Sequence, residues 1–426
     1  MGKCIVIGGG IAGLTSAAYL LNNGFHVTLL ESSPKLGGRA YSLKDDYLND
    51  EIDNGQHILM GCYTDTLNFI KLIGAKDNYI YQNSLQVNFL KTEKREVKFN
   101  APGKLYPLNL LIALLGYKAV TFQDRLSIIR FIMKLPFVSP RKIRNMNVNE
   151  WLGAERQSED VVKSLWKIIA VGALNTSIEK ASAITFRDIL LKIFFKGNFA
   201  STIILPKYGL SKSYVKNAVD FLEWKMGVVE FSSNVEELTI SENKIVELKT
   251  ANKSYKDFDF IISAVPFYSL VKFLPDDILN QDINFEYSSI LNIHIWLSQN
   301  PLKENFYGLI DSPVHWIFNK GSHINLVISD ANYLMDKSAE EVYEMCLQEL
   351  KLFTTISESD VQDYKVIKEK RATFIPTNKI INSRPSSKTK VNNLFLAGDW
   401  IDTGLPSTLE GAVKSGRIAA ENVMAF

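Results

Sequence analysis

The stretch VIGGGIAGLTSAAYLLNNGFHVTLLESSPKLGGRAYS, residues 6–42, decides how the fold begins. Residues 3–7 are mostly β-branched and are followed by glycine, which is typical of a buried parallel strand. Residues 11–22 predict a helix, and residues 26–31 predict a second strand. The order strand, helix, strand over so short a length predicts a βαβ unit.

Glycines occupy the turn between the first strand and the helix. Gly8, Gly10 and Gly13 have the spacing G-x-G-x-x-G. Gly8 suits a tight turn, Gly10 lets the backbone approach a pyrophosphate, and Gly13 allows close packing of helix on strand. The backbone N–H groups at the helix start, around Ile11 and Ala12, would face the anion. This part of the chain therefore predicts a dinucleotide site.

The second strand ends in an acid, Glu31, eighteen residues beyond Gly13. A carboxylate at this place can accept both hydroxyls of an unphosphorylated adenosine ribose, as in FAD or NAD. The doublet Gly37 and Gly38 follows, and glycines permit backbone beside a bulky ligand. Arg39 comes next and can reach a phosphate or the edge of a flavin.

The glycine motif, Glu31 and the run L-G-G-R at 36–39 together resemble a flavoprotein family. This family contains amine oxidases, carotenoid desaturases and Rab GDP-dissociation inhibitors. The resemblance implies a Rossmann-like FAD-binding domain of the GR2 type, with FAD bound lengthwise. Because no cysteine lies near the C-terminal motif, we expect the FAD to be bound non-covalently.

The last segment of the chain is expected to hold the flavin end of FAD. The run LFLAG, residues 394–398, predicts a buried strand that ends at Gly398. Asp399 follows it and matches the position where the family uses an acid to bind the ribityl chain.

A helix is predicted to begin at Ser407, where Ser407 and Glu410 have the spacing of a capping box. The N-terminus of a helix carries roughly half a positive charge. Directed at the pyrimidine edge of the flavin, it would stabilise the negative charge of the reduced form. Thr408 and Leu409 are the expected backbone donors.

The middle of the chain supplies a third segment of the same domain. Residues 228–266 predict a short strand, two alternating strands joined by SENK, and a buried strand. Val235 matches the family position whose backbone pairs with adenine.

The predicted fold class is α/β, with a mixed sheet-and-helix substrate domain inserted into the FAD-binding domain. The FAD-binding domain is predicted to comprise 1–75, 204–268 and 388–426. The substrate domain is predicted to comprise 76–203 and 269–387, and it would face a membrane if its basic apolar helices lie on a membrane surface.

The insertions are strongly apolar. Strand-like runs at 291–298 and 314–329 suit a sheet that forms the floor of a pocket. Residues 124–137 and 189–199 predict helices that set basic side chains among apolar ones. Such helices either lie on a membrane surface, where a lipid could enter, or pack in the core with their basic groups reaching solvent.

Two stretches narrow the resemblance within the family. Residues 53–63, DNGQHILMGCY, and residues 397–416 resemble the hydroxysqualene dehydroxylases of hopanoid and squalene biosynthesis. Phytoene and zeta-carotene desaturases share the GQH region more loosely and are the alternative. Gly55, Gln56 and His57 match family positions whose main chain lies along the isoalloxazine. A flavin amine oxidase and a non-catalytic lipid carrier are further alternatives.

The resemblance implies reductive dehydroxylation of an apolar isoprenoid. Hydroxysqualene is an allylic alcohol, so loss of hydroxide leaves a delocalised cation that hydride from reduced FAD can quench. A positioned acid would assist the departure. Asp53 and Asp402 are the candidates, because they lie in the two motifs expected to flank the flavin ring. Either carboxylate could instead accept hydrogen bonds from backbone N–H groups.

Composition excludes several other classes. The net charge of +2 and the lack of a run of basic residues argue against nucleic acid. Cys4, Cys62 and Cys346 are too few and too scattered for a disulfide framework or a metal site, which favours the cytoplasm. The apolar run 105–120 is shorter than the ~20 residues that span a bilayer. The electron donor and the oligomeric state are left open.

Overall fold

The computed structural model describes residues 2–44, 51–104, 106–275, 278–279 and 283–426. Leu105, which opens the apolar run 105–120, lies outside the described residues, as do parts of the predicted segments 1–75 and 269–387.

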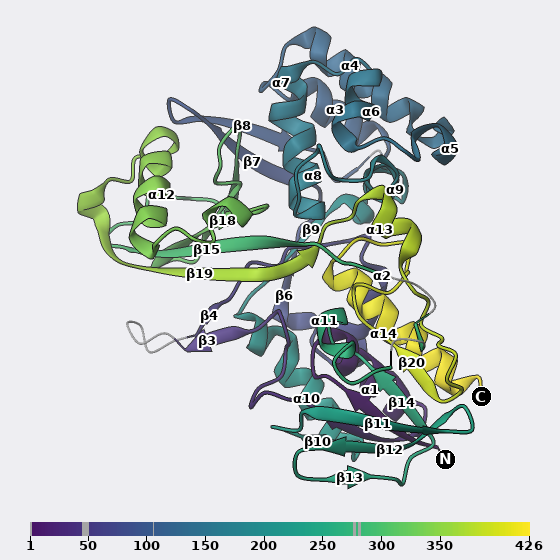
Figure 1. Cartoon of the computed structure of the whole chain (residues 1–426). Helices are drawn as coiled ribbons and strands as arrows, with labels where there is room; N and C mark the ends of the chain where they lie inside the picture. The colour runs from purple at the N-terminus through teal and green to yellow at the C-terminus, as the bar shows by residue number, and fades with distance from the viewer. Residues whose placement is uncertain (1, 45–50, 105, 276–277, 280–282) are drawn as a thin grey trace.

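A parallel sheet of five strands forms one end of the molecule (Figure 1). In spatial order, its strands are β10 (Val228–Glu230), β2 (His26–Leu30), β1 (Lys3–Ile7), β14 (Phe260–Ser263) and β20 (Leu394–Leu396). Helix α1 (Ile11–Asn22) connects β1 to β2. The predicted βαβ unit is therefore confirmed, as is the assembly of one sheet from three separated segments.

Helix α1 packs closely on the last helix, α14 (Leu409–Met424). A Cβ added at Gly416 would lie 2.3 Å from the carbonyl oxygen of Ala12. The hydroxyl of Ser16 is 2.9 Å from the carbonyl oxygen of Gly416 and 3.0 Å from that of Ala12, and it donates across this contact. Small residues on both helices thus hold the two ends of the chain together.

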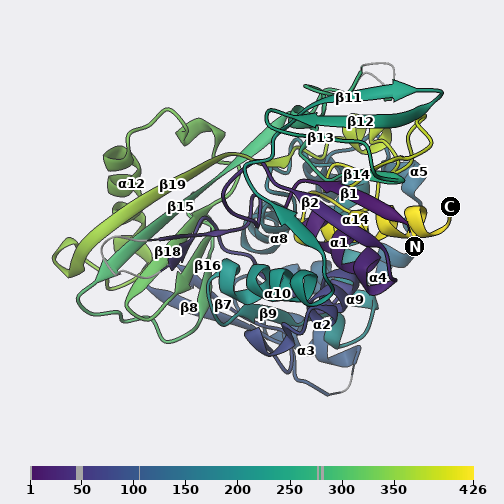
Figure 2. The same cartoon turned by 90° about the horizontal axis from the view of Figure 1, so that it is seen from below.

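A three-stranded antiparallel sheet lies beside β14, as Figure 2 shows from below. It contains β11 (Val235–Ser241), β12 (Lys244–Thr250) and β13 (Ser254–Tyr255). Glu242 and Asn243 join β11 to β12 with φ of 47° and 60°. Two successive residues with positive φ are the signature of a tight hairpin turn, so the hairpin predicted through SENK is confirmed.

A second large sheet, of seven strands, is mostly antiparallel. In spatial order, it contains β19 (Val361–Phe374), β15 (Tyr287–Leu297), β18 (His323–Ile328), β17 (Trp316–Asn319), β16 (Phe306–Leu309), β7 (Gln86–Lys91) and β8 (Arg95–Asn100). The strand-like runs predicted at 291–298 and 314–329 fall within it. Helix α12 (Ala339–Phe353) packs against this sheet.

A group of helices covers the other end of the molecule (Figure 1). It contains α3 (Leu108–Gly116), α4 (Phe122–Lys134), η2 (Leu135–Phe137), α5 (Pro140–Ile143), α6 (Val148–Ala154), α7 (Glu159–Val161), η3 (Val162–Trp166), α8 (Lys167–Leu174), α9 (Ala183–Phe195) and η4 (Phe199–Ser201). Its core is aromatic: the ring centroid of Phe131 lies 5.0 Å from those of Trp151 and Trp166.

The remaining elements connect these parts. They are β3 (Ser42–Lys44), β4 (Glu51–Asp53), β5 (Leu59–Met60), α2 (Thr64–Leu72), η1 (Lys76–Asn78), β6 (Tyr79–Tyr81), β9 (Ile203–Pro206), η5 (Ser211–Val215), α10 (Lys216–Trp224), α11 (Phe267–Leu270), η7 (Asn332–Leu334), η8 (Glu358–Asp360) and α13 (Asn378–Ser383). The small sheet β5-β9-β6 joins strands on both sides of the predicted domain boundaries, and the division into two domains stays a prediction. Within the described residues, every helix falls short of the length and apolarity that crossing a membrane requires.

We predict that Gly416→Ala destabilises the protein by about 1–3 kcal/mol, because the new methyl group would overlap the Ala12 carbonyl and force α1 and α14 apart. Urea unfolding of the flavin-free protein measures this. The control is Gly153→Ala in α6, where an added Cβ meets nothing within 4 Å. Stability equal to the wild type in Gly416→Ala would show that the helices tolerate a wider separation.

Candidate functional site

A cavity of about 1020 Å³ follows the carboxyl ends of the parallel strands. Gly8 comes directly after β1 and Glu31 after β2. Ala264 comes directly after β14, and Gly398 closely follows β20. All four line the cavity, and ligands of open α/β sheets bind at this edge.

The structure brings most of the sequence-predicted cofactor residues to this cavity. Those that line it are Gly8, Gly10, Ile11, Ala12, Glu31, Gly37, Gly38, Arg39, Gly55, Gln56, His57, Val235, Gly398, Asp399, Thr408 and Leu409. They come from the first, middle and last segments of the chain. Gly13 does not line the cavity.

The glycines of the first turn have the geometry that their spacing predicts. Gly8 has a φ of +101°, where residues with a side chain are strained. The nearest atom to a Cβ added at Gly10 would be 3.8 Å away, in Gly38, so the backbone of Gly10 faces open space in the cavity. A Cβ at Gly13 would lie only 1.9 Å from the carbonyl oxygen of Gly8. Gly13 therefore serves packing, whereas Gly10 leaves room for a ligand.

The Glu31 carboxylate is buried beside the glycine turn. It accepts hydrogen bonds from the backbone N–H of Gly9, at 2.7 Å, and of Ser33, at 2.8 Å. The Ser32 hydroxyl also donates, at 3.2 Å, to the carboxylate oxygen that Ser33 binds. A carboxylate offers about four acceptor positions, so the oxygen bound by Gly9 retains capacity for a ribose hydroxyl.

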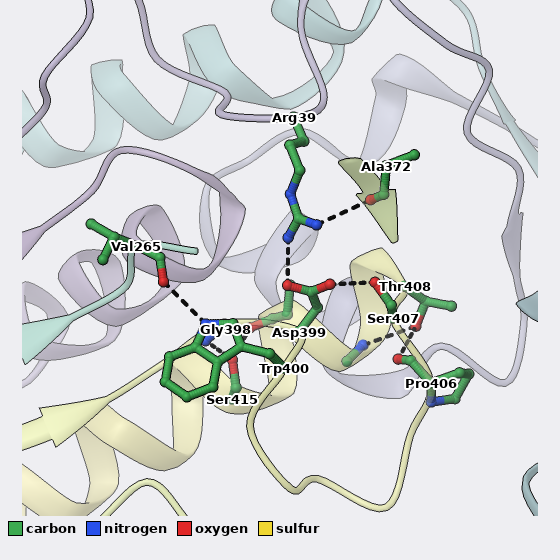
Figure 3. A network of polar contacts seen from close by, with 12 residues as sticks. Arg39, Val265, Ala372, Gly398, Asp399, Trp400, Pro406, Ser407, Thr408 and Ser415 are labelled. Atoms are coloured by element: carbon green, nitrogen blue, oxygen red, sulfur yellow. Dashed lines mark hydrogen bonds and ion pairs between the residues drawn. The ribbon is translucent and has the colours of Figure 1, made fainter. Parts of the chain in front are cut away.

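An ion pair between two residues of the cavity lining, Arg39 and Asp399, joins the first segment of the chain to the last (Figure 3). One Arg39 nitrogen donates to the Asp399 carboxylate, and the other donates to the Ala372 carbonyl at 3.0 Å. The Ser407 hydroxyl donates to the second oxygen of Asp399. Burial alone would raise the pKa of Asp399, but the charge and hydrogen bonds of Arg39 and the Ser407 hydroxyl hold it below its usual value.

The predicted capping box of the last helix is wrong. Helix α14 begins at Leu409, and its N-cap is Thr408, whose hydroxyl accepts from Gly411 N–H at 3.1 Å. The Ser407 hydroxyl is engaged by Asp399 instead. The Glu410 carboxylate accepts from the backbone N–H groups of Asp65 and Thr66, so it caps α2 rather than its own helix.

Polar groups converge where Gly55, Gln56 and His57 meet the seven-stranded sheet. The Asn292 amide donates to the Asn54 carbonyl at 3.0 Å. The side-chain nitrogen of Gln56 and the side-chain oxygen of Asn292 are buried and have no hydrogen-bond partner among the described residues. Burial and the nearby Arg39 charge lower the pKa of His57 to about 4, so its imidazole is neutral at pH 7. Unpaired buried polar atoms beside a cavity are suited to a polar ring.

The two predicted acids are placed differently from the cofactor residues. Asp53 is buried but does not line the cavity, and its carboxylate accepts from Leu210 N–H at 2.7 Å and the Ser42 hydroxyl at 2.9 Å. Burial raises the pKa of Asp53. The side chain of Asp402 is 55% exposed and forms an ion pair with Arg384 at 3.3 Å. It does not line the cavity either.

Beyond the polar groups the cavity continues into an apolar arm. Its lining side chains come from the large sheet and from the helical end, and they include Leu85, Val87, Phe89, Phe99, Leu114, Leu165, Ile168, Ile169, Ile193, Phe194, Ile290, Trp316, Phe318 and Val327. The sheet therefore forms one wall of the pocket, as the sequence predicts. The cavity thus has a polar arm along the parallel strands and a continuous apolar arm beyond them.

Two acids that the sequence did not single out, Glu236 and Glu369, also line this cavity, and Glu369 lies beside its apolar part. Glu369 on β19 lines it opposite Ile290 on β15, and both side chains lie on the same face of the sheet. The Glu369 carboxylate makes no hydrogen bond or ion pair with another described residue. Glu369 lies in a strand dense in charged residues, where the sequence offers no signal that singles it out.

The polar edge of the parallel sheet, with its glycine turn and helix N-termini, defines the class of nucleotide-binding α/β proteins. The sequence profile described as flavin containing amine oxidoreductase matches residues 11–424. The chain belongs to this family and is a flavin-dependent oxidoreductase.

Individual relatives share the full length of the chain. A hydroxysqualene dehydroxylase of Zymomonas mobilis is 27% identical over 419 residues, which cover 98% of this chain and 97% of the relative. A 15-cis-phytoene desaturase of Glycine max is 22% identical over 456 residues, 99% of this chain and 79% of the relative. The structure of cyclohexylamine oxidase from Brevibacterium oxydans has a TM-score of 0.67 at 14% identity, covering 100% and 99% of the two chains. The fold is therefore that of the flavin amine oxidases.

We predict that Asp399→Asn lowers the free energy of unfolding by about 1–3 kcal/mol at pH 7. This loss is smaller than the loss expected for a fully buried ion pair, because the Arg39 side chain is 30% exposed and solvent screens its charge. The folded-state pKa of Asp399 is depressed, so its contribution is present above the unfolded-state pKa of about 3.9 and is lost as pH falls further. The difference between variant and wild type should be constant from about pH 8 to pH 5 and shrink below about pH 4.

Urea unfolding across this pH range measures the difference. Asp257→Asn is the control, because Asp257 forms an exposed ion pair with Lys3 and its removal should change little. A difference of equal size at pH 3.5 and pH 7 would contradict the assignment of the charge to Asp399.

Proposed function

We propose that the cavity binds FAD non-covalently along its polar arm. Gly8, Gly10, Ile11 and Ala12 would hold the pyrophosphate, Glu31 the ribose and Val235 the adenine. Gly37, Gly38, Arg39, Gly398 and Asp399 would hold the phosphates and ribityl chain, and Gly55, Gln56, His57, Thr408 and Leu409 the flavin ring. Gly13 would support the turn from behind. The open space at Gly10 and the unpaired polar atoms of Gln56 and Asn292 support this fit.

We further propose that the substrate is an apolar isoprenoid and that the reaction is the reductive dehydroxylation of hydroxysqualene to squalene. The observation that carries this is the apolar arm, which is continuous with the polar arm and lined by aliphatic and aromatic side chains. The full-length similarity to hydroxysqualene dehydroxylases supports the choice of substrate.

The reaction breaks the allylic C–O bond, forms a C–H bond and releases water. Reduced FAD, when bound, supplies the hydride. The apolar arm would hold the polyene and exclude water from the cation. The N-terminus of α14, with Thr408 and Leu409 facing the cavity, would stabilise negative charge on the pyrimidine edge.

The departing hydroxide needs a proton. The sequence predicts Asp53 or Asp402 for this role, but neither residue lines the cavity. Glu369 does face it, has no hydrogen-bond or ion-pair partner among the described residues, and lies beside Ile290 of the apolar lining. We therefore propose Glu369 as the proton donor.

The second candidate function is desaturation of a carotenoid precursor. The same apolar arm would hold phytoene, and the similarity to phytoene desaturases spans 99% of this chain. The alignment covers 79% of the Glycine max phytoene desaturase, but 97% of the Zymomonas mobilis hydroxysqualene dehydroxylase.

Single turnover distinguishes the two functions. We predict that the FAD-loaded, dithionite-reduced protein, mixed anaerobically with hydroxysqualene, yields squalene and oxidised flavin in equal amounts. Gas chromatography of the extract and absorbance of the flavin measure both products. No squalene above a boiled control would reject dehydroxylation, and conversion of phytoene to a coloured polyene by the oxidised protein with a quinone would establish the alternative.

We predict that Glu369→Gln slows this turnover by about 10²–10⁴-fold, because the amide cannot supply the proton. Flavin content should not change, since the substitution keeps the size of the side chain. Asp53→Asn and Asp402→Asn, assayed in parallel, are expected to retain the rate. An unchanged rate in Glu369→Gln, or a loss confined to one of the two aspartates, would reassign the proton donor.

A further inference from the structure

The helical end of the molecule carries bulky apolar side chains on its outer face. On α3 these are residues 108, 112 and 115, and on α4 and η2 they are residues 122, 126, 133 and 137. These spacings place each set along one side of its helix. Phe122 is 61% exposed, Met133 68% and Phe137 87%. Buried Ile128, Phe131 and Ile132 hold the opposite side of α4 in the core.

Hydrogen bonds connect α3 to α4 and to α9. Arg125 of α4 donates to the Leu115 carbonyl at 2.9 Å, which brings the end of α3 to the first turn of α4. The Tyr106 hydroxyl donates to the Phe194 carbonyl at 2.9 Å, and the Asn109 amide to the side chain of Asn198 at 2.6 Å. These bonds tie the start of α3 to the end of α9.

The exposed apolar side chains of these connected helices are treated as one set. It consists of Leu108, Ile112, Leu115, Phe122, Leu126, Met133, Phe137, Phe195 and Phe199. We call this set the apolar outer surface.

Positive charge is concentrated around this surface. Residues 104–144 contain eight lysines and arginines and one acid, Asp124, whereas the whole chain carries a net charge of only +2. Lys118, Arg130 and the cluster Arg141, Lys142 and Arg144 are exposed. Apolar side chains surrounded by basic ones are typical of helices that lie in the interface of an anionic bilayer.

The same helices separate the apolar outer surface from the interior of the cavity. Leu114 of α3 lines the apolar arm, while Leu115, the next residue, is exposed. On α9, Ile193 and Phe194 line the arm and Phe195 is exposed. A single layer of helix therefore lies between the apolar arm and the outside.

We propose that the apolar outer surface docks the protein on an anionic lipid bilayer, and that apolar substrate passes between bilayer and cavity beside α3 and α9. The docking is argued from the exposure and charge of the helices alone, whereas the passage of substrate also rests on the proposed function. The bilayer is favoured over a second protein because the basic side chains match anionic head groups and the protruding rings suit insertion. Peripheral docking of this kind needs no helix that crosses the membrane.

Vesicle sedimentation tests the docking. The full-length protein is mixed with phosphatidylcholine vesicles, with and without phosphatidylglycerol. The wild type should sediment with the anionic vesicles, and more weakly with the neutral ones or in high salt. Met133→Ser combined with Phe137→Ser should lower the partition by at least about tenfold, since two large apolar side chains no longer insert.

Trp224→Ser combined with Met226→Ser is the matched control. These side chains are 72% and 85% exposed, and they lie at the end of α10, far from α4 (Figure 1). This variant should bind vesicles like the wild type. Arg141→Gln with Lys142→Gln and Arg144→Gln should weaken binding to anionic vesicles and leave the weak binding to neutral ones unchanged.

Single turnover with substrate dispersed in detergent separates the two proposals. The Met133 and Phe137 variant should keep its wild-type rate in detergent and lose rate only when the substrate is presented in vesicles. Failure of the wild type to bind anionic vesicles would overturn the docking, as would equal binding by the variant. Self-association in solution that this variant abolishes, without vesicle binding, would assign the surface to a second copy instead.

Discussion

The ion pair between Arg39 and Asp399 is the contact on which the arrangement of the site depends. It joins residues 360 positions apart, and both residues line the cavity, so the first and last segments of the chain meet in its wall. A buried carboxylate is costly without a partner, so Asp399 is held in place by the Arg39 charge and the Ser407 hydroxyl together. The close contact of α1 with α14 at Gly416 packs the same two segments directly against each other.

Local sequence was enough to predict the parts of the fold that local physics determines. The strand 3–7 and the helix 11–22 are encoded by short patterns of β-branched, apolar and glycine residues, and the structure has both with these bounds. Tertiary contacts explain what the sequence missed. Ser407 has the spacing of a cap, but its hydroxyl is taken by Asp399, and Glu410 caps a helix that is more than 300 residues away along the chain.

The position of the candidate proton donor likewise depends on tertiary contacts that the local sequence does not encode. The motif around Asp53 was expected to flank the flavin, and its neighbours at 54–57 do line the cavity, but the carboxylate of Asp53 faces Leu210 and Ser42. Which side of a chain faces a cavity depends on strand pairing that the motif does not encode. Glu369 reaches the cavity through its pairing opposite Ile290, a long-range register that no local pattern in β19 reveals.

The proposed roles of the site residues all require the polar arm to hold an extended dinucleotide, with its adenosine half at Glu31 and Val235. Titration of the flavin-free protein with FAD and, separately, with FMN tests this directly by quenching of flavin fluorescence. Because FMN lacks the adenosine half, FAD should saturate one site per chain and FMN should bind far more weakly. Equal affinity for the two, or no binding of FAD, would contradict the account.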